Sequence, residues 1–250
     1  MGTKQWPNIT ISSAVASAQS SLVKHPSSGD TLKSHLAQIT QPRIRPRSDM
    51  AEKMIEYYKI KCCVVGANFV GKTSLIRQYV THKFTESYSA TIGMDITVKE
   101  IDLRFGLVTH HVTISLHDLA GQYRFESLHK NFLKGADAAI VVVAQDDPDS
   151  LYGKKDIHSD KVITINDWID RIDEANKPKF VPKILVINKC DLETNLISDD
   201  EIKDACEKNK ILGAYRTSAK TGENVSKIFQ VVAGIPLVRE NIEISPDDEA

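Results

Sequence analysis

A short apolar run followed by the segment GANFVGKT, Gly66 to Thr73, constrains the fold of this chain more than any other feature. The run, residues 59–65, has the character of a buried strand, and the segment matches the pattern G-x-x-x-x-G-K-[ST] of a phosphate-binding loop between a strand and a helix. Such a loop turns backbone N–H groups toward phosphate oxygens, and the helix N-terminus adds partial positive charge. We therefore expect a bound nucleotide, with Lys72 reaching its phosphates and Thr73 ligating Mg²⁺. The contacts expected from this loop are Gly66, Asn68, Phe69, Val70, Gly71, Lys72, Thr73 and Ser74.

Apolar strands alternate with amphipathic segments from about residue 58 onward. Residues 95–105 and 108–118 have the alternation of two strands joined near Phe105 and Gly106, whereas AAIVVVA and KILVINK are continuous apolar runs. Continuous runs are typical of strands buried on both faces of a parallel sheet. Val225, Ile228, Phe229 and Val232 follow helical spacing and predict a late helix with one apolar stripe. The pattern predicts an α/β domain of doubly wound type.

The segment INKCD follows a predicted buried strand and places Asn188, Lys189 and Asp191 at the spacing N-K-x-D. An aspartate carboxylate can accept two hydrogen bonds from the N1–H and the exocyclic amine of guanine, whereas adenine presents an acceptor at N1. The backbone of the later segment TSAK, which contains Ser218, Ala219 and Lys220, could receive the guanine O6. These segments favour guanine, so we expect GTP and GDP as ligands.

A further segment, HDLAGQ, lies between GANFVGKT and INKCD in the chain. Asp118 ends a predicted strand and can hold Mg²⁺ through a water, the Gly121 N–H can sense the γ-phosphate, and the Gln122 amide can orient an attacking water. The order of the three segments indicates a nucleotide-dependent switch.

The segments GANFVGKT, SATIG, DLAGQ, NKCD and TSAK, in this order, resemble those of a Ras-superfamily small GTPase, and SYSATIGMD with DLAGQYRFESL most resembles the Rab branch. The resemblance covers about residues 58–235. It implies a P-loop NTPase small G domain with a mostly parallel six-stranded sheet and helices on both faces. It also implies GTP hydrolysis to GDP, with Gln122, Lys72 and Thr91 as catalytic residues and Thr73, Thr91 and Asp118 around Mg²⁺. Expected partners are an exchange factor, a GAP and an effector, in intracellular vesicle trafficking or signalling.

Several positions depart from that family pattern. Asn68 and Phe69 stand where relatives often have small residues, and their side chains could crowd the arginine finger of a GAP. No arginine precedes Thr91 as a built-in finger would, so slow intrinsic hydrolysis is expected. The positions matching the aromatic effector triad of Rab proteins hold Ile96, His117 and Phe132, only one of which is aromatic.

Two alternatives remain open at this point. One is a guanine-nucleotide-binding interaction module with little or no hydrolysis, although Gln122 and Thr91 argue against it. The other is an adenine-nucleotide kinase or ATPase, which Asp191 disfavours.

The ends of the chain differ from its middle. Residues 1–57 form a Ser-rich, basic stretch predicted to be a disordered arm, residues 58–235 the G domain, and residues 236–250 an acidic tail. No cysteine follows Cys206, so no C-terminal prenyl anchor is expected. The insertion YGKKDIHSDKVIT, residues 152–164, is predicted to be a solvated loop, with a partner-binding role as the less favoured alternative.

The composition excludes some classes of partner. Lys and Arg total 32 against 33 Asp and Glu, so a nucleic-acid partner is not expected. No apolar run is long enough to span a membrane, and the four cysteines lack metal-ligand spacing, which suits a reducing compartment. We expect a soluble, monomeric, cytoplasmic protein, with peripheral membrane contact only through a partner.

Overall fold

The computed structural model describes residues 55–85, 91–105, 108–122, 126–156 and 160–243. Its main sheet has six strands in the order β2-β3-β1-β4-β7-β8, and all neighbouring pairs are parallel except β2 with β3. The bounds are β1 Ile55–Val65, β2 Met94–Phe105, β3 Val108–Leu119, β4 Ala138–Ala144, β7 Lys183–Asn188 and β8 Ala214–Arg216. The predicted α/β class with a mostly parallel six-stranded sheet is confirmed.

The two continuous apolar runs form the centre of the sheet. All residues of β4 and of β7 are buried, and the two strands pair in parallel from Ala139 opposite Lys183 to Ala144 opposite Asn188. A strand in this position has a helical layer against each face, so its side chains are apolar at successive positions rather than at alternate ones.

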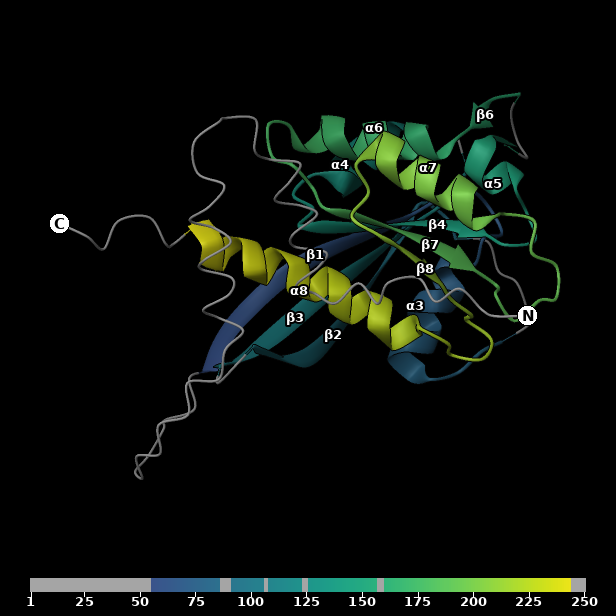
Figure 1. Ribbon diagram of the computed structural model, residues 1–250. Helices are drawn as coiled ribbons and strands as arrows, with labels where there is room; N and C mark the ends of the chain where they lie inside the picture. The colour runs from purple at the N-terminus through teal and green to yellow at the C-terminus, as the bar shows by residue number, and fades with distance from the viewer. Residues whose placement is uncertain (1–54, 86–90, 106–107, 123–125, 157–159, 244–250) are drawn as a thin grey trace, which may run out of the picture.

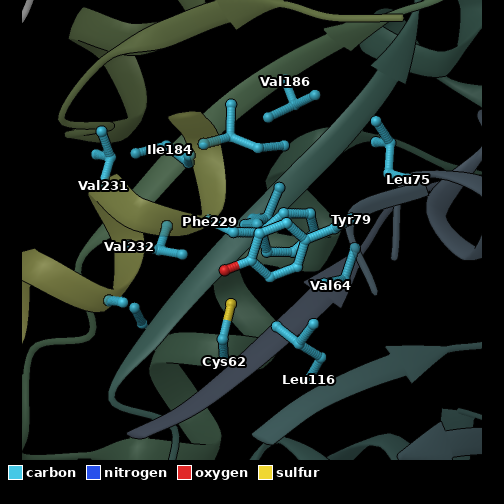
Figure 2. Packing of buried hydrophobic residues seen from close by; sticks show 14 of the residues in the cluster. Cys62, Val64, Leu75, Tyr79, Leu116, Ile184, Val186, Phe229, Val231 and Val232 are labelled. Carbon is cyan, nitrogen blue, oxygen red and sulfur yellow. The ribbon is translucent and has the colours of Figure 1, made fainter. Parts of the chain in front are cut away.

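Helices cover both faces of the sheet and create two hydrophobic cores. The helices α3 (Lys72–Thr81) and α8 (Val225–Glu243) pack on one face, and α4 (Glu126–Leu133), α6 (Ile165–Asn176) and α7 (Asp199–Asn209) on the other (Figure 1). Alternate residues of β1 divide between the cores, with Cys62 in the first and Cys63 in the second. In the first core the rings of Tyr79 and Phe229 stack with centroids 4.2 Å apart (Figure 2). All four cysteines are free thiols.

The domain extends slightly beyond its predicted limits at both ends. The sheet begins at Ile55, and α8 contains Pro236 and continues to Glu243. Most of the predicted arm and the last residues of the predicted tail lie outside the described residues. Although α8 has 19 residues, neither it nor another helix in the described part is long and apolar enough to cross a membrane.

The described residues of the insertion at 152–164 are mostly exposed to solvent, as predicted, but they form a short hairpin rather than an irregular loop. After the short helix α5 (Asp149–Tyr152), the strands β5 (Lys154–Lys155) and β6 (Val162–Ile163) pair as an antiparallel hairpin, in which residues 157–159 lie outside the described part. The side chains of Asp156 and Ile163 are only 5% and 4% exposed. Among the described residues of the insertion, only these two side chains are buried, so its polar composition gave no sign of a hairpin.

Candidate functional site

A cavity of about 500 Å³ lies where the loops after β1, β3, β7 and β8 meet at the carboxyl edge of the sheet. Ligands of open α/β sheets bind at this edge. The sequence-predicted residues that line the cavity are Asn68, Phe69, Gly71, Lys72, Thr73, Ser74, Thr91, Gly121, Gln122, Asn188, Lys189, Asp191, Ala219 and Lys220. Gly66, Val70, Asp118 and Ser218 do not line it, but each touches or holds a lining residue.

The phosphate loop passes close to the sheet and holds Lys72 in place. The Lys72 Nζ donates hydrogen bonds of 2.9 and 2.8 Å to the carbonyl oxygens of Gly66 and Ala67. Burial lowers the pKa of Lys72 to about 8, although the nearby Asp118 carboxylate opposes the shift. Gly66 has φ 140°, and a Cβ atom there would lie 2.2 Å from the carbonyl oxygen of Val142. The loop can therefore approach the sheet this closely only with glycine at its start.

Three oxygen-bearing side chains converge beside this lysine, from α3, from the segment before β2, and from β3. The Thr73 Oγ1 donates a hydrogen bond of 2.5 Å to Asp118 Oδ2 and lies 2.9 Å from Thr91 Oγ1. Thr91 Oγ1 lies 3.4 Å from the same carboxylate oxygen. Burial raises the pKa of Asp118, which is 3% exposed, and Lys72 opposes this.

The composition of this oxygen cluster fits magnesium. Hydroxyl and carboxylate oxygens are ligands that Mg²⁺ accepts. The Oδ1 atom of Asp118 is buried and has no hydrogen-bond partner among the described residues. This oxygen is therefore available to interact with a bound ion or its water. Thr73, Thr91 and Asp118 are the residues that could hold the ion.

Gly121 and Gln122 follow β3 and close one side of the cavity. A Cβ atom at Gly121 would lie 2.6 Å from the carbonyl carbon of Ala67, so this backbone is pressed against the phosphate loop. The Gln122 side chain is 3% exposed, and its Oε1 atom has no hydrogen-bond partner within the described residues. The amide is thus held at the cavity with an acceptor available.

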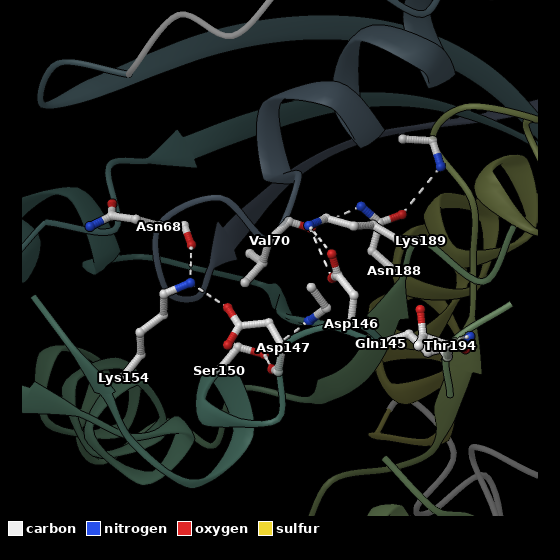
Figure 3. A network of polar contacts seen from close by, with 12 residues as sticks. Asn68, Val70, Gln145, Asp146, Asp147, Ser150, Lys154, Asn188, Lys189 and Thr194 are labelled. Atoms are coloured by element: carbon white, nitrogen blue, oxygen red, sulfur yellow. Dashed lines mark hydrogen bonds and ion pairs between the residues drawn. The ribbon is translucent and has the colours of Figure 1, made fainter. Parts of the chain in front are cut away.

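Asn188 ties the loops on the other side together (Figure 3). Its Nδ2 donates a 2.8 Å hydrogen bond to the Val70 carbonyl oxygen, and its Oδ1 accepts from the Ala219 amide at 3.2 Å and the Thr217 hydroxyl at 3.3 Å. The side chain is 1% exposed. Asn188 therefore connects the phosphate loop with the segment TSAK, a bracing role that the sequence did not indicate.

The carboxylate of Asp191 lies at the outer end of the cavity. Its Oδ1 accepts a 2.6 Å hydrogen bond from the Ser218 hydroxyl, and that hydroxyl accepts from the amides of Lys220 and Thr221. Lys189 has φ 67°, and its Nζ lies 3.0 Å from the Asp146 carboxylate. These contacts fix the direction of Asp191 while it stays exposed to a ligand.

Sequence reasoning missed other lining residues: Arg77, Phe84, Thr85 and Leu192. Arg77 lies one helical turn after Thr73 on α3, so helical spacing could have indicated it. Leu192 directly follows the predicted Asp191. Phe84 and Thr85 lie in a loop without periodicity, where no pattern marked them.

The three positions that match the aromatic effector triad of Rab proteins are only partly exposed. Ile96 on β2 lies opposite His117 on β3 and is 49% exposed, whereas Phe132 packs against the second core. Partial burial lowers the pKa of His117, with a smaller contribution from Lys61.

Comparisons with known proteins agree on one family. The Ras family model matches residues 61–235. The chain is 33% identical to "Ras-related protein Rab7" of Drosophila melanogaster over 177 residues, which are 70% of this chain and 78% of that protein. It is 33% identical to "Ypt/Rab-type GTPase avaA" of Emericella nidulans, with 74% and 85% covered. It is 34% identical to "Ypt/Rab-type GTPase ypt7" of Schizosaccharomyces pombe, with 74% and 84% covered.

Proposed function

This chain belongs to the Ras family, as a Rab-like small GTPase that hydrolyses GTP, and from that premise we propose that it is a switch whose nucleotide occupies the cavity described above. The observation that carries the proposal is that Lys72 and Asp191 line the same cavity. A cation suited to phosphate and a carboxylate suited to guanine thus face one ligand site.

The phosphate end would be bound by the loop Gly66 to Ser74. Its backbone N–H groups and Lys72 would stabilise charge on the β- and γ-phosphates. Thr73, Thr91 and Asp118 would hold Mg²⁺, which supplies neutralisation of phosphate charge when bound. Gln122 would orient the water that attacks the γ-phosphate in line.

The base end would be read by the Asp191 carboxylate, which can accept hydrogen bonds from guanine N1–H and the 2-amino group. Asn188 would act mainly by bracing the phosphate loop against the segment TSAK. Lys189 also lines the cavity. The backbone of Ser218, Ala219 and Lys220 would receive the guanine O6. Phe84, 39% exposed, offers an apolar ring to the same ligand.

Turnover without a partner is proposed to be slow. In this family an arginine supplied in cis or by a GAP accelerates hydrolysis by about 10³–10⁵. The two residues directly before Thr91, where a built-in arginine would be expected, are Ser89 and Ala90. Asn68 and Phe69 both line the cavity at the loop, so a GAP would have to accommodate these side chains. An exchange factor and an effector complete the proposed partner set for a monomeric switch.

Regulation of intracellular vesicle trafficking is the proposed biological role. It is supported by the likeness to Rab-type GTPases alone. The protein would be cytoplasmic and would meet membranes through a partner. A tagged chain that never associates with membranes in its GTP-bound form would count against this role.

Nucleotide selectivity tests the proposed site. The purified protein should bind fluorescent GDP in the presence of Mg²⁺, with unlabelled GDP displacing it at least about 100-fold better than ADP. Chelation of Mg²⁺ by EDTA should accelerate GDP release. Equal displacement by ADP would overturn the assignment of guanine.

A further inference from the structure

The hairpin of β5 and β6, residues 154–163, brings a lysine to the outside of the phosphate loop (Figure 3). The Nζ atom of Lys154 lies 3.3 Å from the Asn68 carbonyl oxygen, and 5.8 Å from the centre of the Phe69 ring. Lys154 is not among the residues that line the cavity. It therefore contacts the loop from outside the cavity lining.

Lys154 is held in this position rather than free to sample solvent. It forms an ion pair with Asp147, and the two side chains are only 23% and 22% exposed. The strand that carries it follows α5 directly, and the backbone amide of Asp156 bonds to the carbonyl of Lys161 at 2.9 Å. Ile163 anchors the returning strand in the second core.

The peptide that Lys154 touches belongs to the phosphate loop itself. The bond between Asn68 and Phe69 is trans, since the only cis peptide in the described residues is Lys177–Pro178. In a planar trans peptide the carbonyl and the N–H point in opposite directions. Because the Asn68 carbonyl points at Lys154, which lies outside the cavity lining, the N–H of Phe69 points away from Lys154.

This conformation needs support, because Phe69 has φ 67°, in the left-handed region that non-glycine residues rarely adopt. Such conformations persist where surrounding contacts hold them, and they concentrate at ligand sites. The ammonium of Lys154 over the Phe69 ring and on the Asn68 carbonyl supplies two such contacts.

We propose that Lys154 is a positioning residue that holds the Asn68–Phe69 peptide with its N–H directed at the β-phosphate of the nucleotide. This inference rests on the proposed function, because it concerns the same site. A charged donor on a carbonyl also polarises the peptide, so the opposite N–H becomes a better donor to a phosphate oxygen.

The proposal predicts that removing Lys154 lowers nucleotide affinity only when the nucleotide has a β-phosphate. GDP has this group and GMP does not, while both present the same base, ribose and α-phosphate. Loss of Lys154 should therefore weaken GDP binding more than GMP binding. General damage to the fold would weaken both ligands alike.

The test compares Lys154→Met, Lys154→Arg and the matched control Lys155→Met, whose lysine pairs with exposed Asp160 on the same hairpin. Affinities for GDP and GMP are measured with Mg²⁺ by displacement of fluorescent GDP. Lys154→Met should weaken GDP binding roughly three- to tenfold, and GMP binding less than about twofold. Lys154→Arg should retain most of the GDP affinity, and the control should match the wild type.

An unchanged ratio of GDP to GMP affinity in Lys154→Met would overturn the inference, whether both affinities stay or both fall together. If that variant does not fold, Lys154→Gln, which keeps a polar side chain at this partly buried position but removes the ammonium, decides by the same ratio. A wild-type protein that binds GDP no better than GMP or ADP would instead contradict the proposed function.

Discussion

The side-chain amide of Asn188 donates a 2.8 Å hydrogen bond to the carbonyl oxygen of Val70, although the two residues are 118 positions apart in the chain. This bond joins the loop proposed to bind phosphates to the segment proposed to read the base.

Asn188→Ala would leave the buried Val70 carbonyl unpaired and remove both bonds to the TSAK segment. We expect GDP release to accelerate at least about tenfold, because an unsatisfied buried group costs about 1–3 kcal/mol. Release of fluorescent GDP is the measurement. Asn209→Ala, which loses one bond within α7, should release GDP at the wild-type rate, and equal release by both variants would contradict the bracing role.

Asp191→Asn tests base recognition. The asparagine can still accept the Ser218 bond through its oxygen, but it presents an N–H donor where the carboxylate presented an acceptor. It should lose affinity for GDP by at least about 100-fold and gain affinity for xanthosine diphosphate, whose C2 carbonyl accepts. Titration with both nucleotides checks this. Asp204→Asn on α7 is the control, and unchanged GDP affinity in Asp191→Asn would refute base reading by this residue.

Gly121→Ala should separate binding from turnover. The added Cβ would lie 2.6 Å from the Ala67 backbone, so the segment after β3 could not press against the phosphate loop. We expect GTP hydrolysis to fall at least about tenfold while GDP affinity stays within about threefold. Gly135 has φ 76°, so Gly135→Ala should strain the backbone and lower stability, but its Cβ would meet no atom within 4 Å and the folded variant should hydrolyse GTP at the wild-type rate. Normal hydrolysis by Gly121→Ala would show that this close approach is dispensable.

Phe229→Ala should destabilise the domain by about 3–5 kcal/mol, since it removes a fully buried ring that stacks on Tyr79 and leaves a cavity in the first core. Urea unfolding at a fixed saturating GDP concentration measures the change, because ligand binding itself adds to stability. Tyr57→Ala, at a position 79% exposed, should change stability by less than about 1 kcal/mol. Similar losses for both would contradict the assignment of the core.

Much of the architecture could be predicted because a few strong patterns determine it. The continuous apolar residues of β4 and β7 indicated the centre of a parallel sheet. The helical spacing of Val225, Ile228, Phe229 and Val232 indicated α8. The three loop segments indicated which residues gather at the carboxyl edge, and most of them line one cavity. Their binding of nucleotide stays a prediction.

The remaining features depend on contacts between distant segments. The bracing by Asn188 requires knowing that two loops meet, and the reach of Lys154 to Asn68 requires knowing that the insertion folds as a hairpin. The polar and charged residues of the insertion carry little periodicity, so its buried anchors Asp156 and Ile163 could not be recognised from the sequence.

Single-turnover hydrolysis by the GTP-loaded protein in Mg²⁺, compared with Gln122→Leu, tests the central claim most directly. Leucine keeps a side chain of similar size but cannot orient a water through an amide. The account predicts slow phosphate release by the wild type, a further fall of at least about tenfold in the variant, and unchanged GTP binding. Phosphate release at the same rate from both proteins would contradict the assignment of Gln122 and, with it, the proposed mechanism of the switch.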